Sequence, residues 1–314
     1  MKALITGGSG FIGSALARRL VGDGHEVVVL DDMSRGARRR LPGCTLIEGD
    51  IRDEDAVLAA VHGCDTVIHM AYVNGTETFY AEPRHVLDVA VRGMSNVLYA
   101  CEAMGCSDLM LISSSEAYQV PEQVPTPETV PLSVPDPLNP RYSYGGGKII
   151  SELMAMAWQR TGVLDRAVVV RPHNIFGPDG GRDHVIPQFC LRMARLDREH
   201  PEGVIPFPVQ GTGTESRSFC YIDDCTDQLA LLLERGDTGI WHVGTMDERA
   251  IAYVAHDIAK CFGREIKIEP GTLRKGSPPQ RCPDTAKIAA LGYRPQVSFR
   301  EGLKRTVEWY RASG

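Results

Sequence analysis

Tyr144 and Lys148 are the two residues whose types and spacing point most directly to catalysis. They stand four positions apart in a segment with helical periodicity, so both side chains project from one face, one turn apart. A phenol ionises near about pH 10, and a neighbouring ammonium lowers its pKa by favouring the phenolate. Such a pair can take the proton of a secondary alcohol. Because the same spacing also occurs by chance on solvated helices, the surrounding segments must decide the prediction.

The N-terminal glycines predict a dinucleotide-binding turn. A buried strand over residues 3–5 ends at the glycines, and an apolar-periodic helix follows them. Glycine here permits a tight turn, close approach of the backbone to a pyrophosphate, and packing of the helix on the strand. The helix N-terminus offers N–H groups and partial positive charge to the phosphates. The residues expected to line this turn are Gly7, Gly10, Phe11, Ile12 and Gly13.

A second apolar strand, over residues 25–30, ends at Asp31 and Asp32. An acidic side chain at the end of this strand can bind the hydroxyls of the adenosine ribose. Arg35 lies close by in the sequence.

Strands and helices alternate through the first half of the chain. Further strands are predicted over 45–48, 66–69, 109–112 and 166–171, and helices over 54–62, 85–104 and 142–159. This order predicts an α/β fold with right-handed crossovers and a doubly wound parallel sheet of the Rossmann type. Ligands of such sheets bind beyond the carboxyl ends of the strands, and polar residues follow these ends in the sequence.

Beyond Pro172 the alternation weakens into a smaller C-terminal α/β lobe that we expect to bind substrate. Residues 119–141 are proline-rich and predict a loop over the site. Shorter elements are predicted at 185–196, 219–222, 224–233 and 239–243, the last of which can return to the main sheet. We therefore expect a dinucleotide-binding domain over residues 1–172, which is rejoined by about 239–262. Residues 173–314 are expected to form mainly the substrate-binding lobe.

Composition excludes several classes of function. The net charge of −6 argues against a nucleic-acid surface. No apolar run reaches the ~18 residues of a membrane span, and the chain begins with a predicted strand rather than a signal peptide. The nine cysteines include no CxxC pair, so we expect free thiols, no metal site and a cytoplasmic protein.

The chain resembles, nearly end to end, the extended branch of the short-chain dehydrogenase/reductase family: nucleotide-sugar epimerases, dehydratases and decarboxylases. The matching motifs are TGGSGFIG at 6–13, GDIRD at 49–53, HMAY at 69–72, SSSEAY at 113–118, YSYGGGK at 142–148, RPHNIFGP at 171–178, SRSFCYIDD at 216–224 and RCPDTAK at 281–287. Three positions depart from the family pattern: Tyr72 stands where alanine is common, Ala90 where asparagine is common, and Gly147 where serine is frequent.

The resemblance implies roles for individual residues. Tyr144 would be the base, Lys148 would hold the nicotinamide ribose, and Ser114 would bridge the substrate hydroxyl. Asp31 would favour NAD over NADP, since it would repel a 2′-phosphate, although Arg35 lies close by. Asp50 and Ile51 would contact the adenine, and Ala71 would join the cofactor contacts. Ser115, Asn174, Arg217 and Arg281 would bind the nucleotide-diphosphate sugar, since the planar fork of arginine pairs with phosphate oxygens. The alternatives without a role in binding are that Asn174 caps a turn and that Arg217 and Arg281 are surface charges.

The family's shared first step is oxidation of sugar C4 to a ketone, and the next step names the enzyme. We expect an NAD-dependent epimerase, which needs no further base. Glu116 keeps a 4,6-dehydratase or a uronate decarboxylase open, because it follows Ser114 and Ser115 as an acid/base glutamate does in those enzymes. An NADPH-dependent keto-sugar reductase is a further alternative. Helices 85–104 and 142–159 carry apolar positions on more than one face, and with the resemblance they favour a homodimer.

Overall fold

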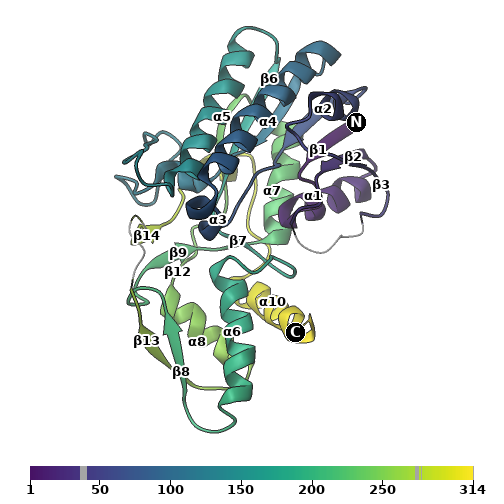
Figure 1. Ribbon diagram of the computed structural model, residues 1–314. Coiled ribbons are helices and arrows are strands. Elements are labelled where there is room, and N and C mark those ends of the chain that lie inside the picture. The colour runs from purple at the N-terminus through teal and green to yellow at the C-terminus, as the bar shows by residue number, and fades with distance from the viewer. Residues whose placement is uncertain (36–40, 273–275, 277, 314) are drawn as a thin grey trace. The chain divides into compact units, whose positions relative to one another are not determined.

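The computed structural model describes residues 1–35, 41–272, 276 and 278–313. The chain forms two compact units (Figure 1). The first contains the described residues up to Tyr118 together with Pro131–Pro172 and Thr226–Val243. The second contains Gln119–Val130, His173–Cys225 and the described residues from Gly244 onward. The predicted domain limits stay a prediction.

A seven-stranded parallel sheet forms the centre of the first unit, in the order β11-β6-β5-β4-β1-β2-β3. This confirms the doubly wound α/β fold. The strand order reverses direction between β1 and β4, the position at which such sheets bind ligands. The predicted return of the strand at 239–243 is also confirmed, because it pairs with β6. The strands are β1 (Lys2–Thr6), β2 (Glu26–Asp31), β3 (Cys44–Glu48), β4 (Thr66–His69), β5 (Asp108–Ile112), β6 (Arg166–Pro172) and β11 (Gly239–Val243).

Helix α4 organises the packing on one face of this sheet, where it contacts both α2 and α5 (Figure 1). It begins at Pro83, whose fixed φ suits a first turn, and ends at Met104, followed by Gly105 as a left-handed cap with φ of +69°. Val97 and Leu98 are fully buried against strand residues such as Leu109. The helices of this unit are α1 (Phe11–Gly22), α2 (Glu54–Val61), α3 (Thr76–Ala81), α4 (Pro83–Met104) and α5 (Tyr142–Arg160), while α7 (Ile222–Arg235) enters it from the second unit.

The second unit combines short strands with the helices α6 (Val185–Glu199), α8 (Ile251–Cys261) and α10 (Phe299–Ser313), which contact one another. A further short helix is α9 (Ala286–Ala290). The strands form the pairs β10-β7 and β13-β8 and the sheet β12-β9-β14. They are β7 (Ile175–Phe176), β8 (Ile205–Val209), β9 (Ser216–Ser218), β10 (Cys220–Tyr221), β12 (Glu248–Ala250), β13 (Ile266–Pro270) and β14 (Gln280–Arg281).

One local prediction needs correction, and two short elements were not predicted. The expected strand at 219–222 is only Cys220–Tyr221, and the following helix already begins at Ile222. The helix Thr76–Ala81 and the 3₁₀ turn Ser115–Tyr118 were not expected. Both are shorter than two helical turns, so neither shows enough of the helical period to be recognised.

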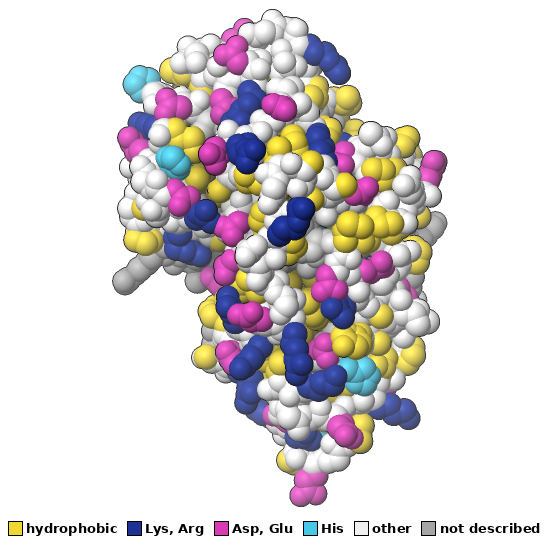
Figure 2. Space-filling view, turned by 180° about the vertical axis from the view of Figure 1, so that it is seen from behind, with side chains coloured by type: hydrophobic (Ala, Val, Ile, Leu, Met, Phe, Trp, Pro, Cys, Tyr) yellow, Lys and Arg dark blue, Asp and Glu magenta, His cyan; other side chains and the backbone are white. Residues whose placement is uncertain are grey.

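Acidic and basic side chains are interspersed over the face shown in Figure 2. Among the described helices, none combines the length and the apolar character that crossing a bilayer requires.

Candidate active site

The glycine turn between β1 and α1 leaves no room for side chains. A Cβ on Gly7, which has φ of +70°, would lie 2.7 Å from the Cα of Ala71. A Cβ on Gly13 would lie 2.5 Å from the carbonyl oxygen of Gly7. Helix α1 begins at Phe11, directly after this turn, with Gly10 as its N-cap. Because the first-turn N–H groups of a helix have no intrahelical acceptors, the turn and helix fit a pyrophosphate.

Asp31 ends β2 with its carboxylate oriented by two backbone amides. The N–H of Ser9, in the glycine turn, donates to one carboxylate oxygen at 2.9 Å, and the N–H of Met33 donates to the other at 2.9 Å. The side chain is buried, whereas that of Asp32 is exposed. Asp31 therefore ties the end of β2 to the turn, and its ribose contact stays a prediction. Arg35 donates to the carbonyl oxygen of Asn74.

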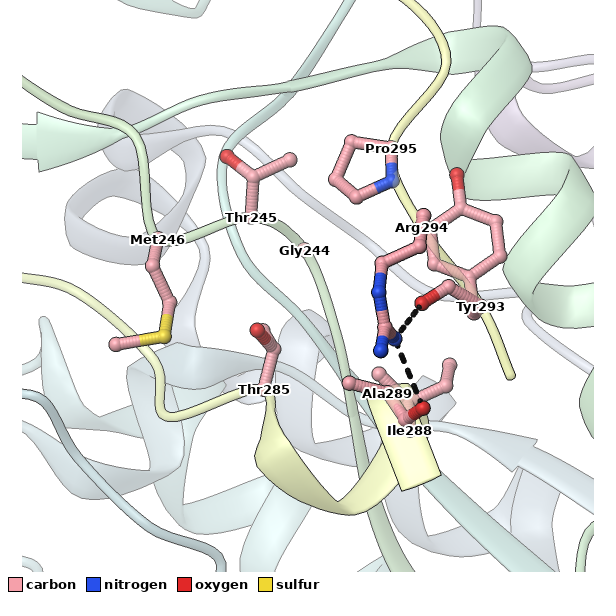
Figure 3. A pocket seen from close by; sticks show the side chains of 9 residues that line it. All are labelled: Gly244, Thr245, Met246, Thr285, Ile288, Ala289, Tyr293, Arg294 and Pro295. Atoms are coloured by element: carbon pink, nitrogen blue, oxygen red, sulfur yellow. Dashed lines mark hydrogen bonds between the residues drawn. The ribbon is translucent and has the colours of Figure 1, made fainter. Parts of the chain in front are cut away.

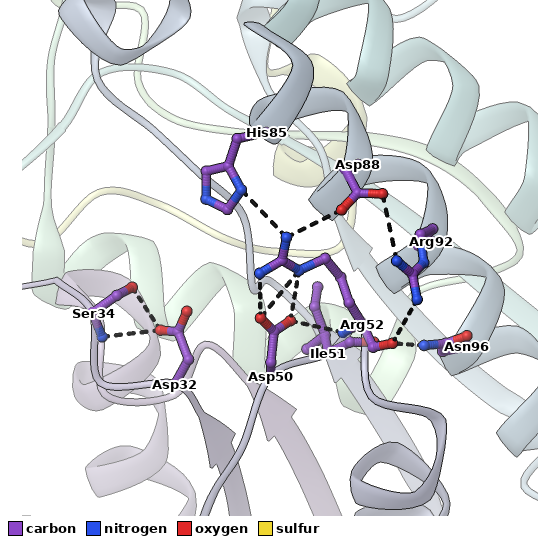
Figure 4. Close-up of polar contacts among 9 residues, drawn as sticks. All are labelled: Asp32, Ser34, Asp50, Ile51, Arg52, His85, Asp88, Arg92 and Asn96. Carbon is purple, nitrogen blue, oxygen red and sulfur yellow. Dashed lines mark hydrogen bonds and ion pairs between the residues drawn. The ribbon is translucent and has the colours of Figure 1, made fainter. Parts of the chain in front are cut away.

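Asp50, predicted to contact adenine, is engaged by Arg52 (Figure 4). The Arg52 Nη2 atom donates to Asp50 Oδ2 at 2.6 Å, and its Nη1 atom lies 3.1 Å from Asp88 Oδ2 on α4. The hydrogen bond from Arg52 holds the pKa of the Asp50 carboxyl below its usual value. Ile51 packs so closely on Gly93 of α4 that a Cβ there would lie 2.2 Å from Ile51 Cδ1. These contacts fix the segment after β3 on α4, which the sequence did not predict.

Lys148 reaches from α5 to the carboxyl end of β5. Its Nζ donates to the carbonyl oxygen of Ile112 at 2.7 Å, two residues before Ser114. The side chain is only 3% exposed. Burial lowers the pKa of Lys148 to about 7, although the charge of Glu152 opposes this shift. The register of α5 thus brings the predicted lysine to the strand end that carries the predicted serine.

Tyr144 lies one turn earlier on the same face of α5. Its ring is buried against Phe79 of α3, with centroids 4.6 Å apart and nearly parallel planes, and the Lys148 Nζ lies 5.8 Å from its centroid. In the segment after β5, the Ser114 hydroxyl accepts a 3.1 Å hydrogen bond from the Glu116 N–H. His69 stays neutral, because burial and the Lys148 charge lower its pKa to about 3.

A buried ion pair joins helix α5 to the end of β6. Glu152, one turn after Lys148, pairs with Arg171 at the end of β6, and each side chain is at most 5% exposed. Ser113 donates to the same carboxylate. Arg171 also donates to the Tyr118 hydroxyl, which lies 2.7 Å from Nε2 of His242 on β11. The network joins three neighbouring strand ends to α5, and its partners are too far apart in sequence for spacing to reveal them.

Glu116 forms an ion pair with Arg141, the residue that precedes α5, at 3.5 Å. The Arg141 side chain is 10% exposed and that of Glu116 is 28% exposed. A partly buried carboxylate with a guanidinium beside it is suited to proton transfer or to binding an acidic substrate group. Glu116 was predicted from the sequence, whereas Arg141 was not.

The second unit places Arg217 and Arg281 side by side, because they are register partners on β9 and β14. Arg249 on β12 pairs with Arg217 from the other side and was not predicted. The Nη2 of Arg217 donates to the Pro278 carbonyl at 2.8 Å, and Arg281 is buried. Asn174 has φ of +42° and donates to the Ser218 carbonyl at 2.9 Å. Arg249, Arg217 and Arg281 are therefore neighbours on adjacent strands, a grouping that only strand register could reveal.

A cavity of about 260 Å³ also opens in the second unit (Figure 3). Arg294 closes one side by donating to the carbonyls of Ala289 and Tyr293 at 3.0 and 2.7 Å. None of the predicted site residues lines this cavity. Within the described ranges, no three His, Cys, Asp or Glu side chains are grouped to hold a metal ion.

These features define the class of protein: a dinucleotide-binding α/β enzyme with a tyrosine–lysine pair at the strand ends. The chain belongs to the NAD dependent epimerase/dehydratase family, whose model matches residues 3–244. Family membership confirms the predicted family and NAD as the cofactor. The glycine turn and Asp31 fit that cofactor.

Individual relatives resemble the chain at a similar level. It is 30% identical over 331 residues to the UDP-N-acetyl-alpha-D-glucosaminuronate decarboxylase of Bacillus cytotoxicus, covering 99% of this chain and 98% of that protein. It is 28% identical over 322 residues to a trifunctional UDP-glucose 4,6-dehydratase, epimerase and reductase of Arabidopsis thaliana, covering 98% of this chain but only 46% of that protein.

Two solved structures are similar over the whole chain. The UDP-glucose 4-epimerase of Thermus thermophilus, in complex with NAD, has 28% identity and a TM-score of 0.87, covering 100% of both chains. A dTDP-glucose 4,6-dehydratase of Streptomyces venezuelae, also with NAD, has 31% identity and a TM-score of 0.86, covering 99% of this chain and 97% of that one. The relatives catalyse different reactions, so the comparisons define an NAD-dependent enzyme of the epimerase, dehydratase and decarboxylase group.

Proposed function

We propose that the protein oxidises C4 of a nucleotide-diphosphate sugar transiently and reduces it again as an epimerase. The observation that carries this proposal is the placement of Lys148 and Tyr144. The two lie one turn apart on α5, and the lysine donates a hydrogen bond to Ile112 at the end of β5, two residues before Ser114. An epimerase needs only this pair and the bound cofactor, because hydride returns to the other face of the same carbon.

The cofactor is held by groups in the first unit. The glycine turn and the N-terminus of α1 take the pyrophosphate, Asp31 takes the adenosine ribose, and Asp50 and Ile51 take the adenine, with Ala71 as a further cofactor contact. Bound NAD supplies the hydride acceptor and donor. Lys148 orients the nicotinamide ribose, and the buried, low-dielectric surroundings of its ammonium strengthen each of its polar interactions.

Three side chains carry out or assist proton transfer at the substrate hydroxyl. Tyr144 takes the proton of the C4 hydroxyl as the C–H bond breaks and returns it when the ketone is reduced. Ser114 hydrogen-bonds the same hydroxyl, and the Lys148 ammonium stabilises the phenolate. Arg217 and Arg281 bind the diphosphate, and Ser115 and Asn174 complete the substrate contacts.

One observation favours a second candidate, a 4,6-dehydratase or a uronate decarboxylase. Glu116, in the turn after β5, forms an ion pair with Arg141, the residue directly before α5. After C4 oxidation, Glu116 could remove the acidified C5 proton of a dehydratase substrate. With a uronate, Arg141 could instead pair with the substrate carboxylate before it leaves as carbon dioxide.

A panel of UDP-, GDP-, CDP- and dTDP-sugars in deuterated water separates these reactions. An isomer without deuterium incorporation supports the 4-epimerase. Loss of water with deuterium at C5 identifies a dehydratase, and release of carbon dioxide identifies a decarboxylase. Free exchange of the cofactor with one net reduction per turnover would identify a reductase and overturn the recycling mechanism.

We also propose a homodimer formed by α4 and α5. Tyr99 and Leu153 expose 56% and 64% of their surfaces on these two helices, and Tyr99 stacks edge-on against Trp158. Such exposed apolar side chains on adjacent helices suit burial against a second copy. Light scattering should give twice the monomer mass, and Leu153→Glu should shift the protein toward the monomer.

A further inference from the structure

Tyr72, which follows β4, contacts both members of the proposed catalytic pair. The Lys148 Nζ lies over its ring, 3.8 Å from the centroid. The same ring meets that of Tyr144 edge to face, with centroids 5.1 Å apart, and its hydroxyl donates to the Tyr144 backbone carbonyl at 3.3 Å. The nearest ring to the buried ammonium is therefore that of Tyr72, since the Tyr144 centroid is 5.8 Å away.

The Tyr72 hydroxyl occupies the place of a side chain at position 147. A Cβ built on Gly147 would lie 2.1 Å from Tyr72 Oη and 2.9 Å from the Cβ of Ala90. Gly147 does not have a positive φ, so its backbone conformation does not require glycine. What requires glycine is space on this face of α5, immediately before Lys148. The three departures from the family pattern, at 72, 90 and 147, are thus one packing arrangement.

We propose that Tyr72 is a positioning residue that holds the Lys148 ammonium beside Tyr144, and that glycine at 147 exists to admit it. The inference rests on the proposed function only in that Lys148 and Tyr144 form the catalytic pair. An aromatic face attracts a desolvated cation through its quadrupole, so the ring favours the protonated lysine and limits its directions.

The other charged and titratable groups around Lys148 act alongside the ring. Glu152, on the same helix, favours the ammonium, but its carboxylate is already bound by Arg171. His69 on β4 is neutral near pH 7, and Tyr144 faces the ammonium from the preceding turn. The Ile112 carbonyl accepts one of its hydrogens. Tyr72 supplies the aromatic face, which a smaller side chain at that position would not replace.

The first test measures the Lys148 titration directly, by NMR of protein labelled at the lysine ε-carbon and assigned with Lys148→Met. Loss of the ring in Tyr72→Leu should lower the Lys148 pKa by about one unit, whereas Tyr72→Phe, which keeps the ring, should leave it nearly unchanged. Equal pKa values in the leucine and phenylalanine variants would overturn the proposal. This readout needs no sugar substrate, so it is independent of the proposed reaction.

The second test is a double-mutant cycle between positions 72 and 147, which stays informative if Tyr72→Leu folds poorly. Gly147→Ser should lower the melting temperature and NAD affinity of the wild-type background, because the new side chain meets the Tyr72 hydroxyl. In a Tyr72→Phe background, which keeps the ring but lacks the hydroxyl, the same change should cost much less, at least about tenfold less in affinity. Equal losses in both backgrounds would show that the two positions are not coupled and would contradict the inference.

Discussion

The Lys148 ammonium of α5 and the Ile112 carbonyl at the end of β5 are joined by a 2.7 Å hydrogen bond in a site that is almost closed to solvent. This contact places the Lys148 side chain of α5 at the carboxyl end of β5. It also places an ionisable group where burial disfavours its charge.

The stability of the cofactor-free protein should depend on pH through Lys148. The lysine has a pKa of about 7 when folded, against a usual value of 10.5, so between these values the unfolded chain binds more protons. The free energy of unfolding should therefore rise with pH across this window, by up to about 1.4 kcal/mol per unit from this group. Urea denaturation at several pH values should show this slope in the wild type and a smaller slope in Lys148→Met. Identical slopes would contradict it.

Removal of the Tyr144 hydroxyl should abolish turnover without releasing the cofactor. Tyr144→Phe keeps the ring stacked on Phe79 but removes the group that accepts the proton, so kcat should fall by at least about 100-fold. NAD content after purification and circular dichroism should match the wild type. Retention of full activity would overturn the catalytic assignment.

Removing only Arg171 from the buried Arg171–Glu152 ion pair should destabilise the fold more than removing both charges. Arg171→Ala leaves the Glu152 charge buried without its guanidinium, so the protein should lose about 3–5 kcal/mol of stability. The double variant Arg171→Met/Glu152→Gln removes both charges and should recover part of this loss. Chemical denaturation of the two proteins gives the comparison, and an equal or larger loss in the double variant would be contrary to expectation.

Asp31 should decide the affinity for NAD. Asp31→Asn keeps the shape of the side chain but removes the charge that binds the ribose hydroxyls, and it weakens the bond to the Ser9 N–H. NAD should bind at least about tenfold more weakly by calorimetry, since hydrogen bonds to a charged group contribute roughly 1.5–3 kcal/mol. Asp23, which is exposed and follows α1, supplies the control: Asp23→Asn should change the affinity little.

The adjacent arginines on β9 and β14 should affect binding of the diphosphate rather than chemistry. Arg217→Ala and Arg281→Ala should each raise KM for the nucleotide sugar by about 10–100-fold and change kcat less. Arg195, 59% exposed on α6, is a matched control for loss of one positive charge. A fall in kcat with unchanged KM would argue against the proposed role.

Much of the fold follows from local pattern. The alternation of apolar strands and helices predicted the parallel sheet, and the return of residues 239–243 to it was anticipated. The short helix at 76–81 and most strands of the second unit were missed, because elements of two to six residues contain too little periodicity. The site residues stay a prediction, although the turn and the strand ends on which they lie are in place.

By itself the sequence determined the parts that depend on neighbouring residues: the glycine turn, the acid that ends β2, and a tyrosine and a lysine one helical turn apart. Only the tertiary structure decided which strand end receives Lys148, that Arg171 pairs with Glu152, and that the Tyr72 hydroxyl takes the place of a side chain at 147. The reason is physical. Backbone geometry repeats every few residues and is visible in local spacing, whereas contacts between distant segments depend on strand register and on how closely helices pack on the sheet.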